Sequence, residues 1–212
     1  MLKIKQLKGK KNYSETIKKM NKQVLKVSEN AEKEEIWFLE HDMVFTSGSS
    51  SSKKYDKDRI DNIPLVKVNR GGKITYHGPG QLVIYPIINI KKRKLNIINY
   101  INIIEDICIK VFKKYSISLI KKKEKNRGLW VKYNNLEKKI IFIGLRYSKG
   151  VIHHGLSINF ENNLKYFRKI DPCGLNNKEI SSLKEIGIIY NKKKIIKSLK
   201  VEFIEKFGPN LI

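Results

Sequence analysis

The sequence predicts an α+β fold, in which helices pack on a mixed β-sheet within a single domain spanning residues 1–212. A length of 212 residues is that of one domain with a sizeable core. Apolar residues repeat at helical spacing in some segments and form short strand-like runs in others. The two kinds of segment interleave without strict strand–helix alternation, which favours a mixed sheet with helices packed on it.

Helical spacing of apolar residues predicts three helices. They cover about 14–29, 97–115 and 193–207. Runs of β-branched and aromatic residues predict the strands. In chain order these are 36–40, 44–46, 65–69, 81–90, 116–120, 129–131, 139–147 and 154–160. A polar, serine-rich loop at 47–52 follows the second strand.

The composition is that of a folded protein, with 41% hydrophobic and 31% charged residues. No apolar stretch approaches the roughly 18 residues that a membrane span needs. The basic N-terminus is not followed by an apolar segment, so we expect no secretory signal. Two cysteines in different settings indicate a reducing compartment, and we expect a cytoplasmic enzyme.

The formal net charge of +25 has three interpretations. It can reflect a compositional drift toward Lys, Asn and Ile, since these residues are over-used throughout the chain. It can attract acidic protein partners and speed their encounter. It can also bind nucleic acid, although the lysines lack the aromatic interleaving of a single-strand binder. Drift and partner attraction are compatible with each other, and nucleic-acid binding is the least favoured interpretation.

The most informative stretch is a glycine-rich loop between residues 70 and 81. It reads Arg70-Gly71-Gly72-Lys73-Ile74-Thr75-Tyr76-His77-Gly78-Pro79-Gly80-Gln81. Glycine lets a backbone approach a ligand closely, and proline fixes a turn. A tight connection between two strands would need fewer glycines. We therefore predict a substrate-binding loop whose polar side chains hold the ligand.

The two cysteines have different predicted roles. Cys173 lies between Pro172 and Gly174, which together prevent a regular helix or central strand. That setting favours a thiol at a cleft, so Cys173 is a candidate nucleophile. Cys108 has helical spacing with apolar neighbours and is predicted to be a core residue. Two distant cysteines and four histidines make a poor zinc site, so no metal is expected.

A cysteine nucleophile needs a base or cation beside it, because a free thiol is mostly protonated at neutral pH. The candidates are His153, His154 and a lysine. Lys139 is placed at the start of an apolar strand that should run through the sheet interior. Desolvation there would lower its pKa and let it act as a base. Spacing alone does not distinguish Lys139 from Lys138.

Four motifs occur in a specific order. They are Arg70-Gly71-Gly72 with Thr75 to Gln81, Lys139-Ile140 with Gly144, His154-Gly155-Leu156-Ser157-Ile158-Asn159, and Pro172-Cys173-Gly174. In this order they resemble the lipoyl(octanoyl) transferases of lipoate biosynthesis, and the resemblance covers roughly 13–190. It implies the fold of biotin and lipoate protein ligases, which is related to class II aminoacyl-tRNA synthetases and biotin synthetases.

The resemblance also implies an activity. Members of the family move an octanoyl group from octanoyl-acyl carrier protein to a lysine of lipoyl domains, in the first step of protein lipoylation. The acceptors would be lipoyl domains of 2-oxoacid dehydrogenase complexes and the glycine cleavage H protein. Cys173 would be the acyl-thioester nucleophile, and Lys139 would lower its pKa and act as base. We expect no cofactor, because the phosphopantetheine arrives on the donor, no membrane or nucleic-acid partner, and a monomer.

The family's substrate-binding segments map onto three stretches. They are Arg70, Gly71, Gly72, Lys73, Ile74, Thr75, Tyr76 and His77, then Phe142, Ile143 and Gly144, then Gly155, Leu156 and Ser157. Apolar side chains among them would line a slot for the acyl chain, and backbone N–H groups of 71–72 or 144 could stabilise an oxyanion. His77 and His154 could bind within the site or be purely structural. Lys73 and Ile74 depart from the family pattern, and so does Phe142, whose bulk leaves the preferred chain length open.

Three alternatives stay open at this point. An ATP-dependent lipoate or biotin protein ligase would share the fold but would need no cysteine nucleophile. A basic nucleic-acid-binding module would be recognised by binding at physiological salt. A catalytically silent acyl-binding scaffold is disfavoured because both Lys139 and Cys173 are present.

Overall fold

The computed structural model describes residues 2–122, 126–133, 135–172 and 179–208. Its main feature is a seven-stranded sheet with the strand order β1-β2-β7-β11-β10-β9-β8. The strands, in spatial order, are β1 (Lys3–Lys11), β2 (Glu35–His41), β7 (Gln81–Asn89), β11 (Val151–Asn159), β10 (Leu136–Ser148), β9 (Gly128–Tyr133) and β8 (Leu119–Lys122). Strands β1 and β2 are parallel and the other neighbours are antiparallel, so the sheet is mixed.

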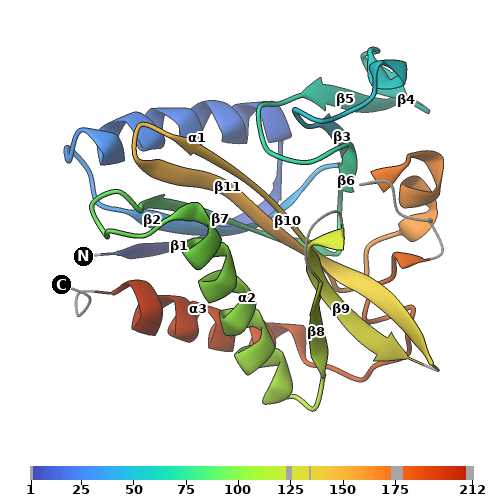
Figure 1. Ribbon diagram of the computed structural model, residues 1–212. Helices are drawn as coiled ribbons and strands as arrows, with labels where there is room; N and C mark the ends of the chain where they lie inside the picture. Colours follow the sequence, from blue (N-terminus) through green and yellow to red (C-terminus); the bar gives the residue numbers. More distant parts are fainter. Residues whose placement is uncertain (1, 123–125, 134, 173–178, 209–212) are drawn as a thin grey trace.

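A second, four-stranded sheet lies beside the first (Figure 1). Its order is β4 (Arg59–Ile60), β5 (Ile63–Lys67), β3 (Val44–Ser47) and β6 (Thr75–His77). Strand β6 lies within the glycine-rich loop and pairs with β3, so part of this loop is held as a sheet edge. The loop therefore starts at the small sheet and leads directly into β7 of the large one.

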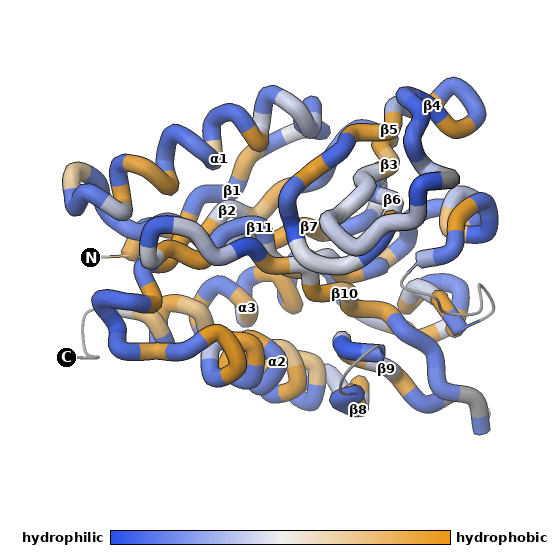
Figure 2. The backbone as a smooth tube through the Cα atoms, turned by 45° about the horizontal axis from the view of Figure 1, so that its top comes forward, coloured by the Kyte–Doolittle hydropathy of each residue, from blue (hydrophilic) through white to orange (hydrophobic). Residues whose placement is uncertain are grey.

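Helices cover both faces of the large sheet (Figure 1). Helix α1 (Tyr13–Ser28) packs on one face, and α2 (Ile97–Lys113) and α3 (Lys192–Phe207) pack on the other. Consecutive residues of β2 point to opposite faces of the sheet. Trp37 packs with α1 on one face, whereas Phe38 packs with α2 and α3 on the other. Hydrophobic residues are concentrated along β10 and α2 in Figure 2. Two short 3₁₀ helices, Lys53–Tyr55 and Leu164–Lys169, complete the described elements.

Each α-helix begins at an asparagine cap. The side-chain oxygens of Asn12, Asn96 and Asn191 accept hydrogen bonds from the backbone N–H three residues later, at 3.0–3.1 Å for the first and last and 2.7 Å for Asn96. Such caps satisfy N–H groups that have no partner within the helix. Among the described residues, no helix combines the length and apolarity that a membrane crossing requires.

The three predicted helices and the eight predicted strands are all confirmed, with ends shifted by a few residues. Strands β1, β4 and β6 were not predicted. Strand β1 alternates lysines with weakly apolar residues and is a partly exposed edge, so its sequence lacks a strong strand signal. Strand β10 is central, as predicted, but it begins at Leu136, which makes Lys139 its fourth residue and not its first.

The central pairing of β7 with β11 depends on Gly155. A Cβ atom on Gly155 would lie 2.0 Å from the carbonyl oxygen of Ile84 and 2.6 Å from Cδ of Pro86. Both neighbours belong to the backbone or ring of the adjacent strand and cannot rotate away. A glycine at this position therefore lets β7 and β11 approach each other, and this structural role is separate from its predicted role in substrate binding.

We expect Gly155→Ala to lower the free energy of unfolding by at least about 3 kcal/mol, because the added methyl group overlaps the backbone of β7. Urea denaturation followed by tryptophan fluorescence measures this change. Gly187→Ala is the matched control, since Gly187 has φ +78° and no atom within 4 Å of an added Cβ. The control should lose only about 1 kcal/mol, from backbone strain. Equal losses in the two variants would show that strand approach at Gly155 is not the constraint.

Candidate active site

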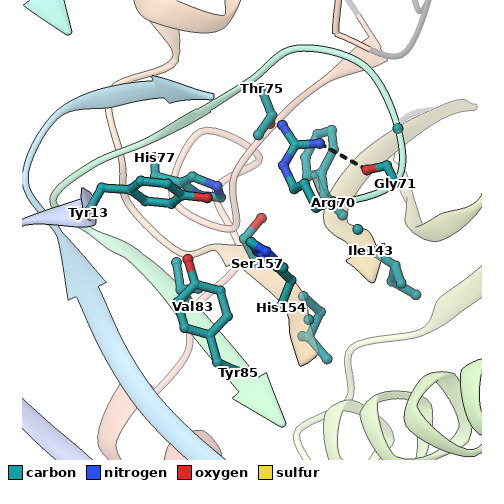
Figure 3. A pocket seen from close by; sticks show the side chains of 15 residues that line it. Tyr13, Arg70, Gly71, Thr75, His77, Val83, Tyr85, Ile143, His154 and Ser157 are labelled. Carbon is teal, nitrogen blue, oxygen red and sulfur yellow. Dashed lines mark hydrogen bonds between the residues drawn. The ribbon is translucent and has the colours of Figure 1, made fainter. Parts of the chain in front are cut away.

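A pocket lies where the glycine-rich loop meets β10 and β11 (Figure 3). Its lining residues are Tyr13, Arg70, Gly71, Gly72, Thr75, His77, Val83, Tyr85, Phe142, Ile143, Gly144, His154, Gly155, Leu156 and Ser157. The aromatic rings of Tyr13, His77 and Tyr85 gather on one side, and Arg70 and Gly71 lie opposite them. The pocket thus combines apolar walls with a few polar groups, which is typical of a small-molecule site.

Arg70 fixes the start of the glycine-rich loop. Its Nη2 donates to the backbone oxygen and the Oγ1 of Thr46, each at 2.7 Å, and its Nη1 donates to the oxygen of Gly71 at 3.0 Å. The N–H of Gly71 then donates to the oxygen of Leu145 at 2.8 Å. The loop is consequently tied to β3 of the small sheet and to β10 of the large one.

A buried hydrogen-bond chain runs from His77 to the backbone of Lys139. Nδ1 of His77 is 2.7 Å from Oε1 of Gln81, and Nε2 of Gln81 donates to Oδ1 of Asn159 at 2.9 Å. Nδ2 of Asn159 donates to the oxygen of Ser181 at 3.0 Å, and the N–H of Ser181 donates to the oxygen of Lys139 at 3.0 Å. All five residues are buried. The chain links the loop to the strand that carries Lys139.

This chain also shows which ring nitrogen of His77 carries a proton. Carbonyl oxygens only accept hydrogen bonds, so the amide nitrogens of Asn159 and Gln81 must point at the oxygens of Ser181 and Tyr76. The remaining oxygen of Gln81 then accepts from Nδ1–H of His77. Burial, and next the nearby His41, lower the pKa of His77 to about 3. His77 is therefore neutral near pH 7, and its Nε2 is a hydrogen-bond acceptor.

A second buried histidine supports the aromatic side of the pocket. Nδ1 of His41 is 2.9 Å from the oxygen of Lys11, and Nε2 is 2.8 Å from the hydroxyl of Tyr85. The carbonyl fixes the proton on Nδ1, so Nε2 accepts from the Tyr85 hydroxyl. Burial lowers the pKa of His41 to about 4. Protonation of this imidazole would remove the acceptor that holds Tyr85.

Lys139 lies behind the Phe142 wall of the pocket. Its side chain is 1% exposed, and its Nζ donates to the oxygen of Arg127 at 2.6 Å. The same nitrogen is 4.9 Å from the centroid of the Phe142 ring and 5.8 Å from that of Trp130. Lys138 is only partly buried. The structure thus separates two lysines that the sequence could not distinguish, because only Lys139 is enclosed beside the pocket.

Cys173 lies outside the described residues, as does the rest of 173–178. The described residues on either side can be placed. Pro172 is buried, and Ile180 forms a β-bridge with Lys139. Ile170 and Ile180 share a hydrophobic cluster with Phe142. The pairing of Cys173 with Lys139 stays a prediction. Cys108 is buried in the core, as predicted, and burial raises its pKa to about 12.

Most of the predicted substrate-binding residues line the pocket. Those that do are Arg70, Gly71, Gly72, Thr75, His77, Phe142, Ile143, Gly144, Gly155, Leu156 and Ser157. Lys73 is exposed, and Ile74 and Tyr76 are buried in the cluster around Phe167. His154 lines the pocket, whereas His153, a candidate base from the sequence, is paired with Ser148 at 3.0 Å and does not. The binding role of the lining residues stays a prediction.

The sequence did not single out four residues that shape the site. Tyr13, Val83 and Tyr85 line the pocket. The period-two alternation of β7 could have placed Val83 and Tyr85 on one face. Gly128, with φ +136°, leaves room for Lys139, since a Cβ there would lie 2.7 Å from Cε of Lys139. No sequence signal identified this contact, because it joins two different strands.

Within the described part of the chain, no group of three or more His, Cys, Asp or Glu residues could hold a metal ion. The groups that line or adjoin the pocket include the Lys139 amine, neutral imidazoles and backbone N–H groups. These suit acyl transfer, in which a base moves a proton and N–H groups stabilise an oxyanion.

Sequence comparison identifies relatives across most of the chain. A family model described as the lipoyl protein ligase A/B catalytic domain matches residues 12–204. The chain is 37% identical over 198 residues to an octanoyltransferase of Wolbachia sp. subsp. Brugia malayi (strain TRS), covering 92% of this chain and 95% of that protein. It is 38% identical over 200 residues to an octanoyltransferase of Buchnera aphidicola subsp. Acyrthosiphon pisum (strain APS), covering 94% and 90%.

Structural comparison supports the predicted fold. A crystal structure of lipoate-protein ligase A bound with ATP superposes with a TM-score of 0.67 at 13% identity, covering 96% of this chain and 85% of that one. At this identity the likeness concerns the fold alone. The predicted biotin/lipoate protein ligase-like fold is confirmed, and the choice between transfer and ligation rests on other observations.

We predict that the protein loses stability as the pH falls from about 6.5 to about 4. The unfolded pKa of His41 is near 6.5 and its folded pKa is about 4, so the unfolded chain binds the proton first. Stability from His41 is complete above pH 6.5 and declines below it, by at most about 3 kcal/mol at 1.36 kcal/mol per pKa unit.

Urea unfolding curves between pH 7.5 and 4.5 measure this loss. His41→Gln is the informative variant, since its amide can still donate to Lys11 and accept from Tyr85 but does not titrate. The variant should show a shallower decline with pH than the wild type. An unchanged slope would exclude His41 as a source of the acid sensitivity.

Proposed function

This chain belongs to the lipoyl protein ligase A/B catalytic domain family, as an acyltransferase of lipoate biosynthesis, and we propose that acyl carrier protein is its octanoyl donor. The acceptor is a lysine of a lipoyl domain. We further propose that Cys173 carries the octanoyl group as a thioester between the two proteins and that Lys139 is its base.

The observation that carries the proposal is the position of Lys139. Its amine lies against Phe142, which is a wall of the pocket. Its backbone pairs with Ile180, the second described residue after the segment that contains Cys173. A buried amine beside an apolar pocket, and next to the flank of a cysteine segment, is the arrangement that a Lys/Cys pair requires.

The pocket walls suit a saturated acyl chain. Val83, Ile143 and Leu156 are among the residues that line the pocket and give it apolar surface. Each methylene buried against such a surface contributes about 0.8 kcal/mol. The reacting carbonyl would then lie toward the Phe142 wall, against which the Lys139 amine packs. The pocket thus offers separate surfaces for the chain and for the reacting carbonyl.

In the first step, neutral Lys139 takes the proton of the Cys173 thiol, and the thiolate attacks the carbonyl carbon of the donor. A new carbon–sulfur bond forms and the bond to the phosphopantetheine sulfur breaks. That sulfur leaves as a thiol after receiving the proton from Lys139. One thioester replaces another, so the step needs no ATP.

In the second step, the ε-amine of the lipoyl domain lysine attacks the acyl-enzyme. A carbon–nitrogen bond forms and the bond to Cys173 breaks. Lys139 accepts a proton from the amine and returns it to the sulfur of Cys173. Backbone N–H groups near the pocket are candidates to stabilise the oxyanion in both steps. The enzyme ends in its starting state.

A ligase reaction on the same fold is the competing function. It would activate a free acid with ATP and would not depend on Cys173. The relatives that cover most of the chain at 37–38% identity are octanoyltransferases, whereas the structure bound with ATP shares 13% identity. These comparisons favour transfer. We place the reaction in the cytoplasm, in keeping with the two separate cysteines.

We predict that mixing the protein with octanoyl-acyl carrier protein, without ATP or magnesium, yields one octanoyl adduct on Cys173. Intact-protein and peptide mass spectrometry detect it, and Cys173→Ser should form no thioester. Lys139→Met should slow adduct formation about 100-fold or more at pH 7, the usual contribution of a general base. The loss should shrink as the pH approaches 8.5, because the thiol then ionises without help.

Lys138→Met is the matched control for Lys139→Met, since it removes a neighbouring charge from a partly buried position. It should form the adduct at the wild-type rate. Full activity of Lys139→Met at pH 7 would assign the base to another residue. An absolute requirement for ATP with free octanoate would overturn the transferase in favour of a ligase.

We predict that transfer from octanoyl-acyl carrier protein slows by about tenfold as salt rises from about 10 to about 150 mM, because screening weakens attraction between a chain of charge +25 and an acidic donor. Steady-state kcat/KM measures the effect. Octanoyl-pantetheine, which carries no protein, is the matched donor and should be insensitive to salt. Equal salt dependence for both donors would show that the surplus lysines do not steer the carrier.

A further inference from the structure

A second cavity adjoins the pocket. It has a volume of about 420 Å³ and lies between α1, residues 67–69 and the β10–β11 hairpin. Its lining includes the apolar residues Ile17, Val24 and Val68 and the histidines His153 and His154. Among the described residues, His154 alone lines both cavities. His154 is thus the residue that lies between the pocket and the second cavity.

The strand register places this second cavity at the far end of the pocket from Lys139. Phe142 pairs with Ser157 at the end near Lys139, and Leu145 pairs with His154 at the other end. The three residue steps from 142 to 145 span about 10 Å at the usual rise of a strand. An extended octanoyl chain is about 9 Å long, from seven carbon–carbon bonds of about 1.5 Å in a zigzag. The distance along the strand from Phe142 to Leu145, the residue opposite His154, is therefore close to the length of an eight-carbon chain.

The backbone holds the His154 ring in this position. His154 has φ +58°, and the pairs Ile152–Ile88 and Leu156–Ile84 place it opposite Pro86, which has no N–H to donate. In a regular strand, consecutive side chains point to opposite faces. Here the rings of His153 and His154 are only 5.2 Å apart, because the left-handed residue breaks the alternation.

The ring itself is enclosed and uncharged. His154 is 3% exposed, and the ring of Tyr85 meets it edge-on at 6.1 Å. Its Nδ1 has no hydrogen-bond partner among the described residues. Burial, followed by His153 and Arg70, lowers the pKa of His154 to about 2. A neutral ring with one nitrogen turned away from any partner can serve as a wall at the end of an apolar slot.

We propose that His154 closes the far end of the acyl slot and thereby sets the preferred chain length at eight carbons. The proposal rests on the proposed octanoyl transfer. Beyond the ring, Ile17, Val24 and Val68 offer apolar surface that further methylenes could reach. Removal of the ring would join the two cavities. His154 is then a specificity-determining residue, with no role in the chemical step.

The variant of choice is His154→Gly. Glycine adopts φ +58° without strain, so this substitution removes the ring while favouring the observed backbone. His154→Asn is a second variant, because asparagine also tolerates the left-handed region and leaves a shorter side chain. His153→Ala is the matched control, since His153 is an equally buried neighbouring histidine that lines only the second cavity.

The experiment compares octanoyl- and dodecanoyl-acyl carrier protein as donors, with thioester formation on Cys173 followed by mass spectrometry. In His154→Gly the ratio of dodecanoyl to octanoyl kcat/KM should rise at least about tenfold, in the range that a few methylenes in an apolar pocket give. His154→Asn should give a smaller rise of the same sign. His153→Ala should keep the wild-type ratio. Circular dichroism confirms that each variant is folded.

The outcomes separate this proposal from the function on which it rests. If the wild type forms no octanoyl adduct, the proposed transfer itself fails. If the wild type reacts but the folded His154 variants keep its chain-length ratio, the slot is not closed by His154 and the inference is overturned. A rise in His153→Ala equal to that in His154→Gly would also overturn it, since the ring between the cavities would then not be the barrier.

Discussion

The site depends on the buried hydrogen-bond chain that joins His77 to the backbone of Lys139 through Gln81, Asn159 and Ser181. Four segments far apart in the sequence meet in this chain: the glycine-rich loop, the end of β11, the segment after residue 178 and strand β10. The side-chain amides of Gln81 and Asn159 each have a single orientation, because their nitrogens donate to the backbone oxygens of Tyr76 and Ser181. A shift in any one segment would leave a buried polar group unpaired, so the chain holds the pocket and Lys139 in one relative position.

Burial also keeps the histidines of the pocket neutral in a strongly basic protein. Burial is the main cause of the lowered pKa values of His41, His77 and His154, and neighbouring imidazoles or Arg70 add to it for the last two. A charged imidazole in this position would need a carboxylate partner, and none lines the pocket among the described residues. Neutral rings can pack against an acyl chain and still accept or donate hydrogen bonds. Arg70 is the charged side chain that lines the pocket, and its guanidinium donates to Thr46 and Gly71.

Features of the structure that depend on residues close together in the sequence could be predicted. The helices followed from apolar spacing, and the glycine-rich loop and the Gly155 motif followed from residues whose backbone chemistry is distinctive. Strand β1 was missed because its lysines mask a partly exposed edge, and β6 because three residues inside a glycine-rich loop carry no periodicity. Tyr13 and Gly128 were missed for another reason. Tyr13 enters the pocket from the first residue of α1, and Gly128 matters only because Lys139 passes over it from the neighbouring strand.

The fold alone does not determine the reaction. In our proposals, one end of the slot determines the type of reaction and the other determines the length of the acyl chain. A structure with the same fold binds ATP, so the distinction between ligation and transfer must lie in individual side chains. At the Lys139 end, an enclosed amine and the flank of the Cys173 segment are where we propose thioester chemistry. At the His154 end, about 10 Å away along the strands, a neutral ring is our proposed limit on chain length. Because the two groups lie about 10 Å apart along the strands, we expect reaction type and chain length to change independently within this fold.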